Sequence, residues 1–452
     1  MRMLTRLTLV CAIALLALAS ASAQVTDLPR VILISIDGLM PSAYTDPALA
    51  AYTPNLRRLA QRGVWADGVV GVLPTVTYPS HTTLITGVEP SLHGIYDNRI
   101  FDPENKSAGA WFWFARSIKV PTLPMAARAR GLTAAAVTWP VTIGMDLDYL
   151  APEYIGPPHP QSLEMLRSLS APRGLIDAAA VARGKPFSWP QNDRDRTDLT
   201  TFILKTFDPN VMLLHLIELD SSQHGAGPGS PEALQTLARV DGHVGEILEA
   251  VKAAGRSDRT HVAVVSDHGF LPVKSQLQPN AALKQAGLLT VDARGSVATW
   301  RAYFHSSGGS GYVYVKDAAD RPRVQQILLD LKKDPANGIR EVWTAEGLAA
   351  KGSHPDAAFG VDVVDGFYTG AGHDALVTPT TSKGGHGFDP ARPALHASFI
   401  LAGPSVQARG SVGVIRMTQV APTLASILDV TLSPAAAQPV DLKKAATSLR
   451  EK

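Results

Sequence analysis

Cysteine is almost absent from this sequence, since Cys11 is the only one among 452 residues. Beyond position 11 the chain can therefore form no disulfide bond and can offer no thiolate to a metal or a substrate. Any metal site must be built from aspartate, glutamate and histidine side chains.

A surplus of charge of either sign is also lacking. The chain carries 42 lysines and arginines against 40 acidic residues, and without residues 1–23, which contain Arg2 and Arg6, the balance is 40 to 40. A formal charge near zero argues against a general nucleic-acid binder, so we expect no nucleic-acid-binding module. The sequence shows no internal repeat and no low-complexity tract, and nothing in it indicates an oligomeric state.

Long apolar runs are missing except at the N-terminus. Two arginines in MRMLTR precede the run LTLVCAIALLALA, and the small residues ASA follow at positions 21–23. This order is typical of an export signal, and we expect residues 1–23 to be a signal peptide cut after Ala23. Because no later window offers about 18 uncharged apolar residues, we expect no transmembrane segment in the mature chain and a periplasmic or secreted location.

Five short apolar runs that end in polar residues predict strands buried on both faces. They are residues 30–38, 133–140, 210–220, 260–269 and 396–404. Helical patterns lie between them at 53–63, 231–255 and 417–429. This alternation predicts an α/β fold with a doubly wound, mostly parallel sheet flanked by helices, in which ligands bind at the carboxyl ends of the strands.

Residues 275–375 differ in character, because they read as strand, strand, helix, strand. We expect them to form a small α+β lid inserted into a catalytic core of residues 24–274 and 376–435, with a C-terminal tail at 436–452. The proline-containing stretch 151–200, with its polar run NDRDRTD, is expected to be a long surface excursion.

Three aspartates and three histidines follow these strands or lie in glycine-flanked turns. They are Asp37, Asp220, His224, Asp267, His268 and His386. Singly, each has an ordinary structural explanation, such as a helix cap or a hydrogen-bonded histidine. Together they offer enough ligands for two divalent ions of the zinc type with open positions, and two such ions about 4 Å apart can clamp a phosphate.

The stretch LPTVTYPSHTT at 73–83 is rich in hydroxyls and has no carboxylate, lysine or arginine. Taken alone, it fits a helix that begins near His81 with Ser80 as its cap. However, the motifs ISIDGL, PTVTYPSHTTLITGVEPSLHGIYDN, ELDSSQHG, VVSDHGF and GGHGF occur in this order along the chain. In this order they resemble the nucleotide pyrophosphatase/phosphodiesterase family of the alkaline phosphatase superfamily, from about residue 30 to 430.

The resemblance implies an alkaline phosphatase-like fold and a role for each matching residue. Asp37, Asp267 and His268 would bind one zinc, which also contacts Thr77, and Asp220, His224 and His386 would bind the second. Thr77, before the pair Tyr78–Pro79, would be the nucleophile that forms a phospho-threonine intermediate. Asn98, 21 residues after Thr77, would hold a phosphoryl oxygen, although an asparagine here also fits an ordinary turn. Tyr78 would stack on a nucleoside. Thr75 lies two residues too early to match, and Ser80 departs from the family's usual asparagine.

The substrate class follows from what surrounds these residues. The segment AVTWPVTIG at 136–144 has no lysine or arginine, whereas a monoester dianion needs more positive charge than a diester. We therefore expect a metal-dependent phosphodiesterase or nucleotide pyrophosphatase acting on a small phosphodiester or a nucleotide. The alternatives are a phosphomonoesterase, with Arg99 supplying charge, a phosphonate hydrolase on the same core, and a zinc-dependent binding protein. The aromatic run WFWFAR at 111–116 fits either packing or substrate contact.

Overall fold

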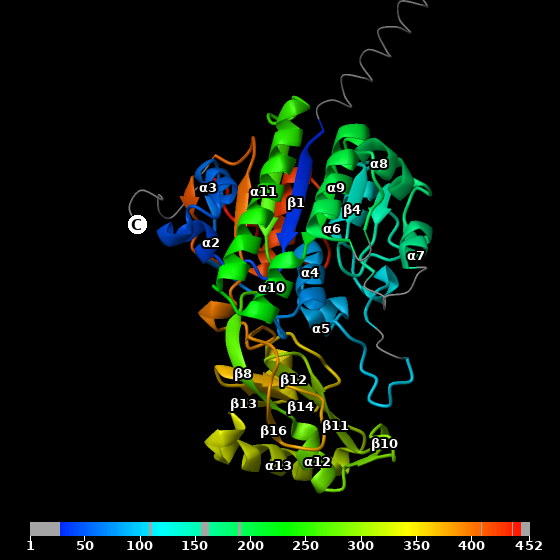
Figure 1. Ribbon diagram of the computed structural model, residues 1–452, viewed down its shortest axis with the longest axis vertical. Coiled ribbons are helices and arrows are strands. Elements are labelled where there is room, and N and C mark those ends of the chain that lie inside the picture. Colours follow the sequence, from blue (N-terminus) through cyan, green and yellow to red (C-terminus); the bar gives the residue numbers. More distant parts are fainter. Residues whose placement is uncertain are drawn as a thin grey trace, which may run out of the picture.

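The computed structural model describes residues 28–107, 111–154, 162–188, 191–407, 409–435 and 437–443. A large sheet flanked by helices forms one part, and a smaller part built around residues 275–375, here called the insert, lies beside it (Figure 1). The signal peptide expected at 1–23 lies outside the described residues. Within the described residues, no helix has both the length and the apolar character needed to cross a bilayer.

The large sheet has eight strands. In order across the sheet they are β19 (Gly410–Ser411), β2 (Val64–Trp65), β18 (Phe399–Ala402), β7 (Thr260–Val265), β1 (Arg30–Ile36), β6 (Val211–Leu216), β4 (Ala134–Val137) and β5 (Tyr149–Ala151). The strands from β7 to β5 are parallel to one another, whereas β18 runs antiparallel to both of its neighbours. The predicted mostly parallel sheet is confirmed.

The register of the central strands determines where polar side chains gather. Ile36 of β1 is paired with Leu216 of β6, and Ser35 is paired with Val265 of β7. All three strands are fully buried along their length. Because parallel strands in register end at one edge, the residues that follow them are brought together there.

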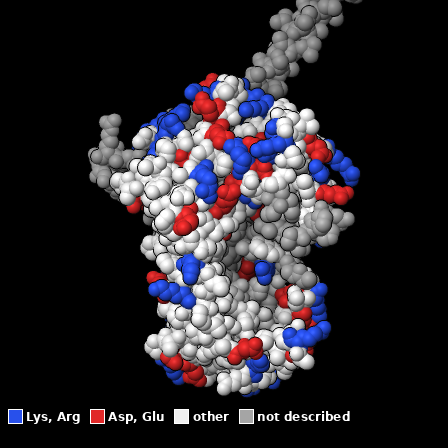
Figure 2. Space-filling view, viewed as in Figure 1, with Lys and Arg blue, Asp and Glu red and all other residues white. Residues whose placement is uncertain are grey.

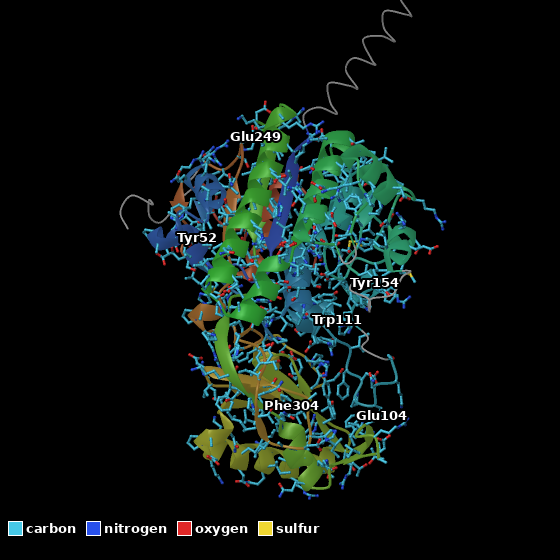
Figure 3. The ribbon with its side chains drawn as sticks, viewed as in Figure 1. Tyr52, Glu104, Trp111, Tyr154, Glu249 and Phe304 are labelled. Carbon is cyan, nitrogen blue, oxygen red and sulfur yellow. The ribbon has the colours of Figure 1, made fainter. Side chains whose placement is uncertain are left out.

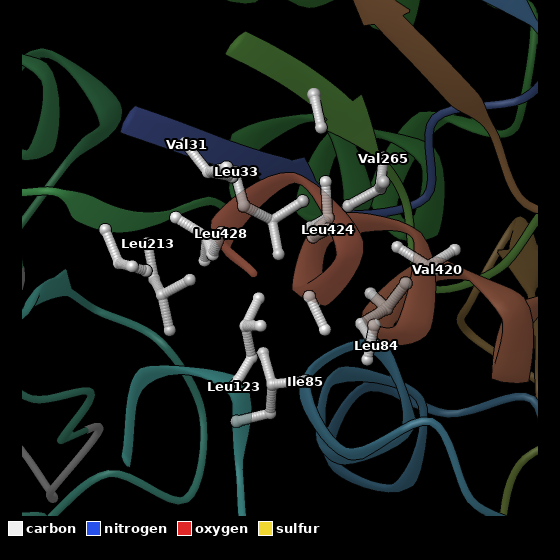
Figure 4. Packing of buried hydrophobic residues seen from close by; sticks show 14 of the residues in the cluster. Val31, Leu33, Leu84, Ile85, Leu123, Leu213, Val265, Val420, Leu424 and Leu428 are labelled. Atoms are coloured by element: carbon white, nitrogen blue, oxygen red, sulfur yellow. The ribbon is translucent and has the colours of Figure 1, made fainter. Parts of the chain in front are cut away.

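Helices cover both faces of this sheet. On one face lie α4 (Thr77–Thr86), α6 (Leu123–Ala129) and α15 (Val420–Leu428); on the other lie α3 (Pro54–Gln61), α8 (Leu175–Arg183), α9 (Asp193–Phe207), α10 (Glu218–Ala226) and α11 (Pro231–Ala253). Figure 4 shows Leu84 and Ile85 of α4 packed with Leu424 of α15 beneath the central strands. This apolar contact anchors the helix that begins at Thr77.

The expectation of a surface excursion over residues 151–200 is wrong. The described part of this stretch contains α7 (Ser162–Leu169), α8 and the beginning of α9, and the side chains of Leu175, Ile176 and Leu199 belong to the sheet's core. The polar run NDRDRTD suggested an exposed segment, but its charges are paired locally, for example Arg196 with Asp193 at 2.7 Å. The apolar residues of the same helix face the sheet.

The insert contains a second, antiparallel sheet in the order β11 (Ala302–Ser306), β12 (Ser310–Val315), β14 (Phe359–Val363) and β13 (Ile339–Thr344). Helices α12 (Pro279–Gln285) and α13 (Arg321–Lys333) pack on it, and Phe304 lies in its core (Figure 3). The strand β8 (Leu271–Leu277) leads into the insert and pairs with β15 (Gly366–Thr369), β16 (Val377–Pro379) and β17 (Gly384–Gly385).

The remaining elements are short. They are α2 (Ser42–Thr45), α5 (Pro90–His93), α14 (Ala345–Ala350), β3 (Gly68–Val70), β9 (Leu289–Val291), β10 (Val297–Trp300), β20 (Val414–Arg416) and the 3-10 turns η1 (Pro47–Leu49), η2 (Ala115–Ser117), η3 (Ala318–Asp320), η4 (Pro335–Asn337), η5 (Pro393–Leu395) and η6 (Met417–Gln419). Figure 2 shows charged side chains of both signs intermixed on one face, and the surface is hollowed where the two parts meet. The face in view carries no broad patch of one sign.

Glu89 lies at the junction between the two parts, because the nearby Ser91 N–H donates to the Gly352 carbonyl of the insert at 2.9 Å. Partial burial raises the pKa of the Glu89 carboxyl to about 7, against a smaller lowering by Arg416. Between its ordinary pKa of 4.5 and about 7, the folded state therefore binds more protons than the unfolded state. Stability must fall as the pH rises through this window.

We expect Glu89→Gln to remove this loss of stability. Near pH 8 the variant should be more stable than the parent by on the order of 2 kcal/mol, and near pH 5 the difference should be small. Urea unfolding of both proteins at the two pH values measures the effect. If the difference between the two proteins is the same at both pH values, the Glu89 carboxyl is not the titrating group.

Candidate functional site

The first group of side chains that could hold a metal ion follows β1 and β7. Asp37, Asp267 and His268 are all buried, and His268 Nε2 lies 3.4 Å from Asp37 Oδ1 and 3.2 Å from Asp267 Oδ2. Asp267 Oδ1 accepts the N–H groups of Gly38 at 3.0 Å and of His268 at 3.1 Å. These two backbone donors hold Asp267 Oδ1 in place, so that Asp267 Oδ2 faces Asp37 and His268.

The second group joins α10 to the turn after β17. Asp220 and His224 lie one helical turn apart, with 3.4 Å between Oδ1 and Nε2. His386 Nε2 lies 3.5 Å from the same oxygen of Asp220 and 3.1 Å from His224 Nε2. The buried Asp193 carboxylate accepts the N–H groups of Ile217 and Glu218 and so stabilises the beginning of α10.

Each histidine of the two groups turns its Nδ1 toward a backbone carbonyl. The partners are Gly384 O for His224 at 2.8 Å, Thr75 O for His386 at 3.0 Å and Gly269 O for His268 at 3.2 Å. A carbonyl only accepts hydrogen bonds, so Nδ1 carries the proton and the lone pair of Nε2 points into the group. This is the tautomer in which imidazole binds a metal ion.

Burial keeps two of these imidazoles neutral. It lowers the pKa of His386 to about 4, together with the neighbouring His224. It also lowers the pKa of His268 well below its ordinary range, with further lowering by His386 and His224. A neutral imidazole is the ligand form, so the surroundings of His268 and His386 favour metal binding at neutral pH.

The unpaired atoms of the site fit metal ions. Asp37 Oδ1, Asp267 Oδ2, His268 Nε2 and Asp220 Oδ1 are buried and have no hydrogen-bond partner among the described residues. Burial, followed by the charges of Asp267 and Asp220, raises the pKa of Asp37 well above its ordinary value. A bound cation would satisfy these oxygens, and three carboxylates with three imidazoles form a donor set that zinc-type ions accept.

The structure brings together all six side chains singled out in the sequence, in the same two sets of three. The sets adjoin, because the rings of His268 and His386 stack with their centroids 3.6 Å apart. The described residues thus contain two neighbouring groups that could each hold a metal ion. The first is buried, whereas the second includes the partly exposed Asp220 and His224.

Thr77 is the first residue of α4, which corrects the predicted helix start. Ser80 is therefore not a cap; it is buried within the first turn, and Val76, the residue before the helix, makes no side-chain cap. Thr77 is partly exposed between the buried residues Val76 and Tyr78. Its hydroxyl thus stands at the positive end of a helix, where an anion is stabilised.

Two buried side chains tie this helix to the metal-ligating groups. His81 Nδ1 lies 2.8 Å from the Thr77 carbonyl oxygen and 3.7 Å from Asp267 Oδ2. Thr75 accepts from Gly387 N–H and donates its hydroxyl to the Phe388 carbonyl at 3.0 Å. Thr75, which does not match the nucleophile position, therefore holds the His386 turn against the segment before Thr77.

Asn98 lies beside the same helix start. Its Oδ1 accepts the Tyr78 N–H at 2.8 Å, which leaves the Nδ2 hydrogens for another acceptor. Its own backbone N–H donates to Asp97 Oδ1 at 2.6 Å, so Asn98 is also part of a local turn. The side chain thus presents an uncharged donor next to Thr77.

Tyr78 is placed differently from the stacking role that the resemblance implies. Its ring is 1% exposed and is met edge-on by Trp111 at 5.3 Å and by Trp113 at 6.1 Å between centroids. Figure 3 places Trp111 at the junction between the sheet and the insert. Since the aromatic run covers Tyr78, the ring has no free face for a nucleoside in this structure, whereas Trp111 and Trp113 are both partly exposed.

One functional candidate, His215, was missed in the sequence. His215, buried in β6, places Nε2 3.1 Å from Asp37 Oδ2 and Nδ1 3.5 Å from Glu153 Oε1. Burial alone would lower the pKa of His215, but its hydrogen bonds to Asp37 and Glu153 raise it to about 10. His215 thus holds the second oxygen of Asp37. A histidine inside the apolar run VMLLHL was the available signal, because a buried imidazole needs a polar partner.

The chain resembles proteins of known family. A family model described as type I phosphodiesterase/nucleotide pyrophosphatase matches residues 31–362. Ectonucleotide pyrophosphatase/phosphodiesterase family member 3 of Mus musculus is 28% identical over 255 residues, which cover 54% of this chain and 25% of that protein. Family member 1 of Homo sapiens is 26% identical over 254 residues, which cover 54% and 24%. The chain thus spans about a quarter of the length of these curated relatives.

Two solved structures share the fold. Murine ectonucleotide pyrophosphatase/phosphodiesterase 5, an inactive variant in complex with AMP, superposes with a TM-score of 0.65 at 20% identity, covering 91% of this chain and 97% of that chain. The human protein of the same name superposes with a TM-score of 0.66 at 19% identity, covering 90% and 97%. The similarity therefore extends over both the sheet and the insert.

Proposed function

This chain belongs to the type I phosphodiesterase/nucleotide pyrophosphatase family, and from this membership and the site we propose that it hydrolyses phosphodiester or pyrophosphate bonds through a phospho-threonine intermediate on Thr77. The observation that carries the proposal is the meeting of two sets of metal-ligating side chains, with His268 and His386 stacked at 3.6 Å. Small phosphodiesters or nucleotides are the proposed substrates, and the AMP bound to the murine relative supports the nucleotide class.

Asp37, Asp267 and His268 would hold one zinc ion together with Thr77, and Asp220, His224 and His386 would hold the second. Such divalent ions polarise phosphoryl oxygens and lower the pKa of a bound hydroxyl. His215 keeps Asp37 oriented through its second oxygen. The backbone carbonyls behind the three histidines keep Nε2 free of a proton.

The proposed reaction has two successive displacements at phosphorus. Thr77 Oγ1 forms a bond to phosphorus while the bond to the leaving oxygen breaks, and a water molecule then cleaves the phospho-threonine and restores the hydroxyl. The positive end of α4 stabilises the anionic phosphoryl group. Asn98 Nδ2 donates to a non-bridging oxygen, where negative charge develops.

A diester is the favoured substrate because the residues around Thr77 bring little positive charge. Trp139, in the segment without lysine or arginine, is fully buried and meets His81 edge-on at 4.9 Å. Arg99 is exposed and lies over the Trp111 ring, 5.6 Å from its centroid. The Arg99 guanidinium is therefore paired with the Trp111 ring and not with the proposed phosphate position.

The test compares bis(p-nitrophenyl) phosphate with p-nitrophenyl phosphate on the purified chain. We expect the diester to have the higher kcat/KM by at least about 100-fold, because the monoester dianion lacks a cationic partner. A faster monoester would identify a phosphomonoesterase and would assign a catalytic role to Arg99. If neither ester reacts, a phosphonate ester is the next substrate to test.

We also propose that residues 1–23 direct export to the periplasm or the outside of the cell. The catalytic core would then comprise residues 24–274 and 376–435, with the insert at 275–375. Residue 275 lies within β8, a strand that pairs on both sides of this boundary, so the two parts are joined by a continuous strand.

Replacing Asn98 should affect the reaction much more than the fold. We expect Asn98→Ala and Asn98→Asp each to lower kcat/KM by about 100- to 1,000-fold, because both remove the donor to the phosphoryl oxygen. Asn98→Asp keeps an acceptor for the Tyr78 N–H, so it should unfold near the parent's temperature. Steady-state kinetics and thermal unfolding measure the two effects; near-parental activity in Asn98→Asp would mean that the amide donor is not used.

A further inference from the structure

One turn of the insert reaches into the site. Residues 306–310, with the sequence SSGGS, connect β11 and β12, and Ser307 and Ser310 are buried. The Gly309 N–H donates to the His386 carbonyl at 2.7 Å, and Ser310 Oγ donates to the Gly387 carbonyl at 2.5 Å. The turn is therefore bonded to the backbone on which a predicted metal ligand sits.

The approach of the two backbones is close enough to require glycine on both sides. A Cβ atom at Gly387 would lie 1.9 Å from the Ser307 carbonyl oxygen, and one at Gly308 would lie 2.4 Å from the His386 carbonyl oxygen. Both glycines also have positive φ, at 88° and 89°. Such packing leaves no room for a side chain at either glycine.

The same turn reaches Asp97, the residue before Asn98. Ser307 Oγ donates a short hydrogen bond to Asp97 Oδ2, and His305 Nε2 lies 3.5 Å from the same oxygen. The other oxygen, Asp97 Oδ1, accepts the N–H groups of Asn98 at 2.6 Å and of Arg99 at 3.4 Å. One carboxylate thus connects the insert to the backbone of Asn98.

We propose that Ser307 and Asp97 are positioning residues for Asn98, so that the insert is a fixed part of the catalytic site instead of a lid that leaves it. Ser307 orients the Asp97 carboxylate, Asp97 holds the Asn98 backbone, and Asn98 is then aligned by its bond to Tyr78 N–H. The catalytic consequence rests on the role proposed above for Asn98. The structural consequence is that Ser307 restrains the Asn98 backbone, and it is independent of the role proposed for Asn98.

The structural consequence is tested first, by hydrogen exchange of the peptide that carries Asn98 and Arg99. We expect Ser307→Ala to accelerate exchange of these amides by about tenfold or more, because Asp97 loses the bond that orients it. Ser306→Ala is the matched control, since the Ser306 hydroxyl bonds to Thr369 at 2.7 Å within the insert. Equal exchange in the parent, Ser307→Ala and Ser306→Ala overturns the proposal, whether or not the protein is a diesterase.

The catalytic consequence is tested on bis(p-nitrophenyl) phosphate with a double-mutant cycle. We expect Asp97→Ala to lower kcat by about 10- to 100-fold with KM changed by less than about threefold, and Asp97→Asn, which keeps an acceptor, to lose less. In the Asn98→Ala background, Asp97→Ala should cost less than about twofold.

An equal loss of kcat in both backgrounds overturns the positioning role, because a residue that acts through Asn98 cannot act when Asn98 is absent. Thermal unfolding of the four proteins separates this result from simple destabilisation, which would appear in both backgrounds. If the parent hydrolyses no diester while Ser307→Ala still accelerates exchange, the proposed function fails and the restraint of Asn98 by the insert stands.

Discussion

Thr77→Ala is expected to lower kcat/KM for a diester by at least about 10,000-fold, because the substitution removes the oxygen proposed to attack the phosphorus of the substrate. Thr77 is the partly exposed first residue of α4, and its side chain packs little into the core. The variant should therefore fold, and its unfolding temperature should stay near that of the parent. Initial rates on bis(p-nitrophenyl) phosphate and a thermal unfolding curve measure both effects.

Thr77→Ser is the matched control, since it keeps the hydroxyl at the same helix position. It should retain activity within about 100-fold of the parent. After an acid quench during turnover, mass spectrometry should find phosphate on the peptide that carries Thr77 in the parent and not in Thr77→Ala. An active Thr77→Ala variant, or phosphate on a different residue, would exclude Thr77 as the nucleophile.

Removal of bound metal is expected to have the second largest effect, a loss of at least about 1,000-fold in kcat, because attacking and leaving oxygens lose their electrostatic stabilisation. Added zinc should restore the activity. Chelation should also lower the unfolding temperature, since Asp37, Asp267 and Asp220 are gathered in one site and bound cations offset their repulsion. Activity, metal content and thermal unfolding are measured before and after chelation.

The Asp267→Asn variant tests whether the loss of activity on metal removal comes from the first group of side chains. We expect it to reduce bound zinc from two ions to about one per chain and to abolish most of the activity, because the first group loses a charged ligand. His243→Gln is a suitable control: its histidine lies on α11, with Nδ1 4.0 Å from Glu246 and outside both groups. A chelated protein that keeps full activity would contradict metal catalysis, and equal zinc in Asp267→Asn would contradict this ligand set.

The secondary structure that positions the site was predictable because its signals are local. The strands β1, β6 and β7 end one or two residues before Asp37, Glu218 and Asp267, and parallel strands bring such ends to one edge. The prediction was wrong where local signals conflict with packing. In residues 151–200 the charges pair along α9 while its apolar face joins the core, and near residue 80 the helix begins at Thr77 without a side-chain cap.

By itself, the sequence singled out six candidate metal ligands, because carboxylate and imidazole side chains lie shortly after apolar runs or in glycine-flanked turns. The order of their motifs, through the family resemblance, implied two sets of three, and the structure groups the same side chains in the same way. Only the tertiary structure decided how these side chains are supported. His215 bonds to Asp37 across 178 residues, Ser307 to Asp97 across 210, and His386 to Thr75 across 311. The burial of Tyr78 beneath Trp111 was decided in the same way. Contacts between residues so far apart in the chain produce no periodic pattern and no fixed spacing in the sequence. They are therefore seen only when the folded chain has brought the two partners together.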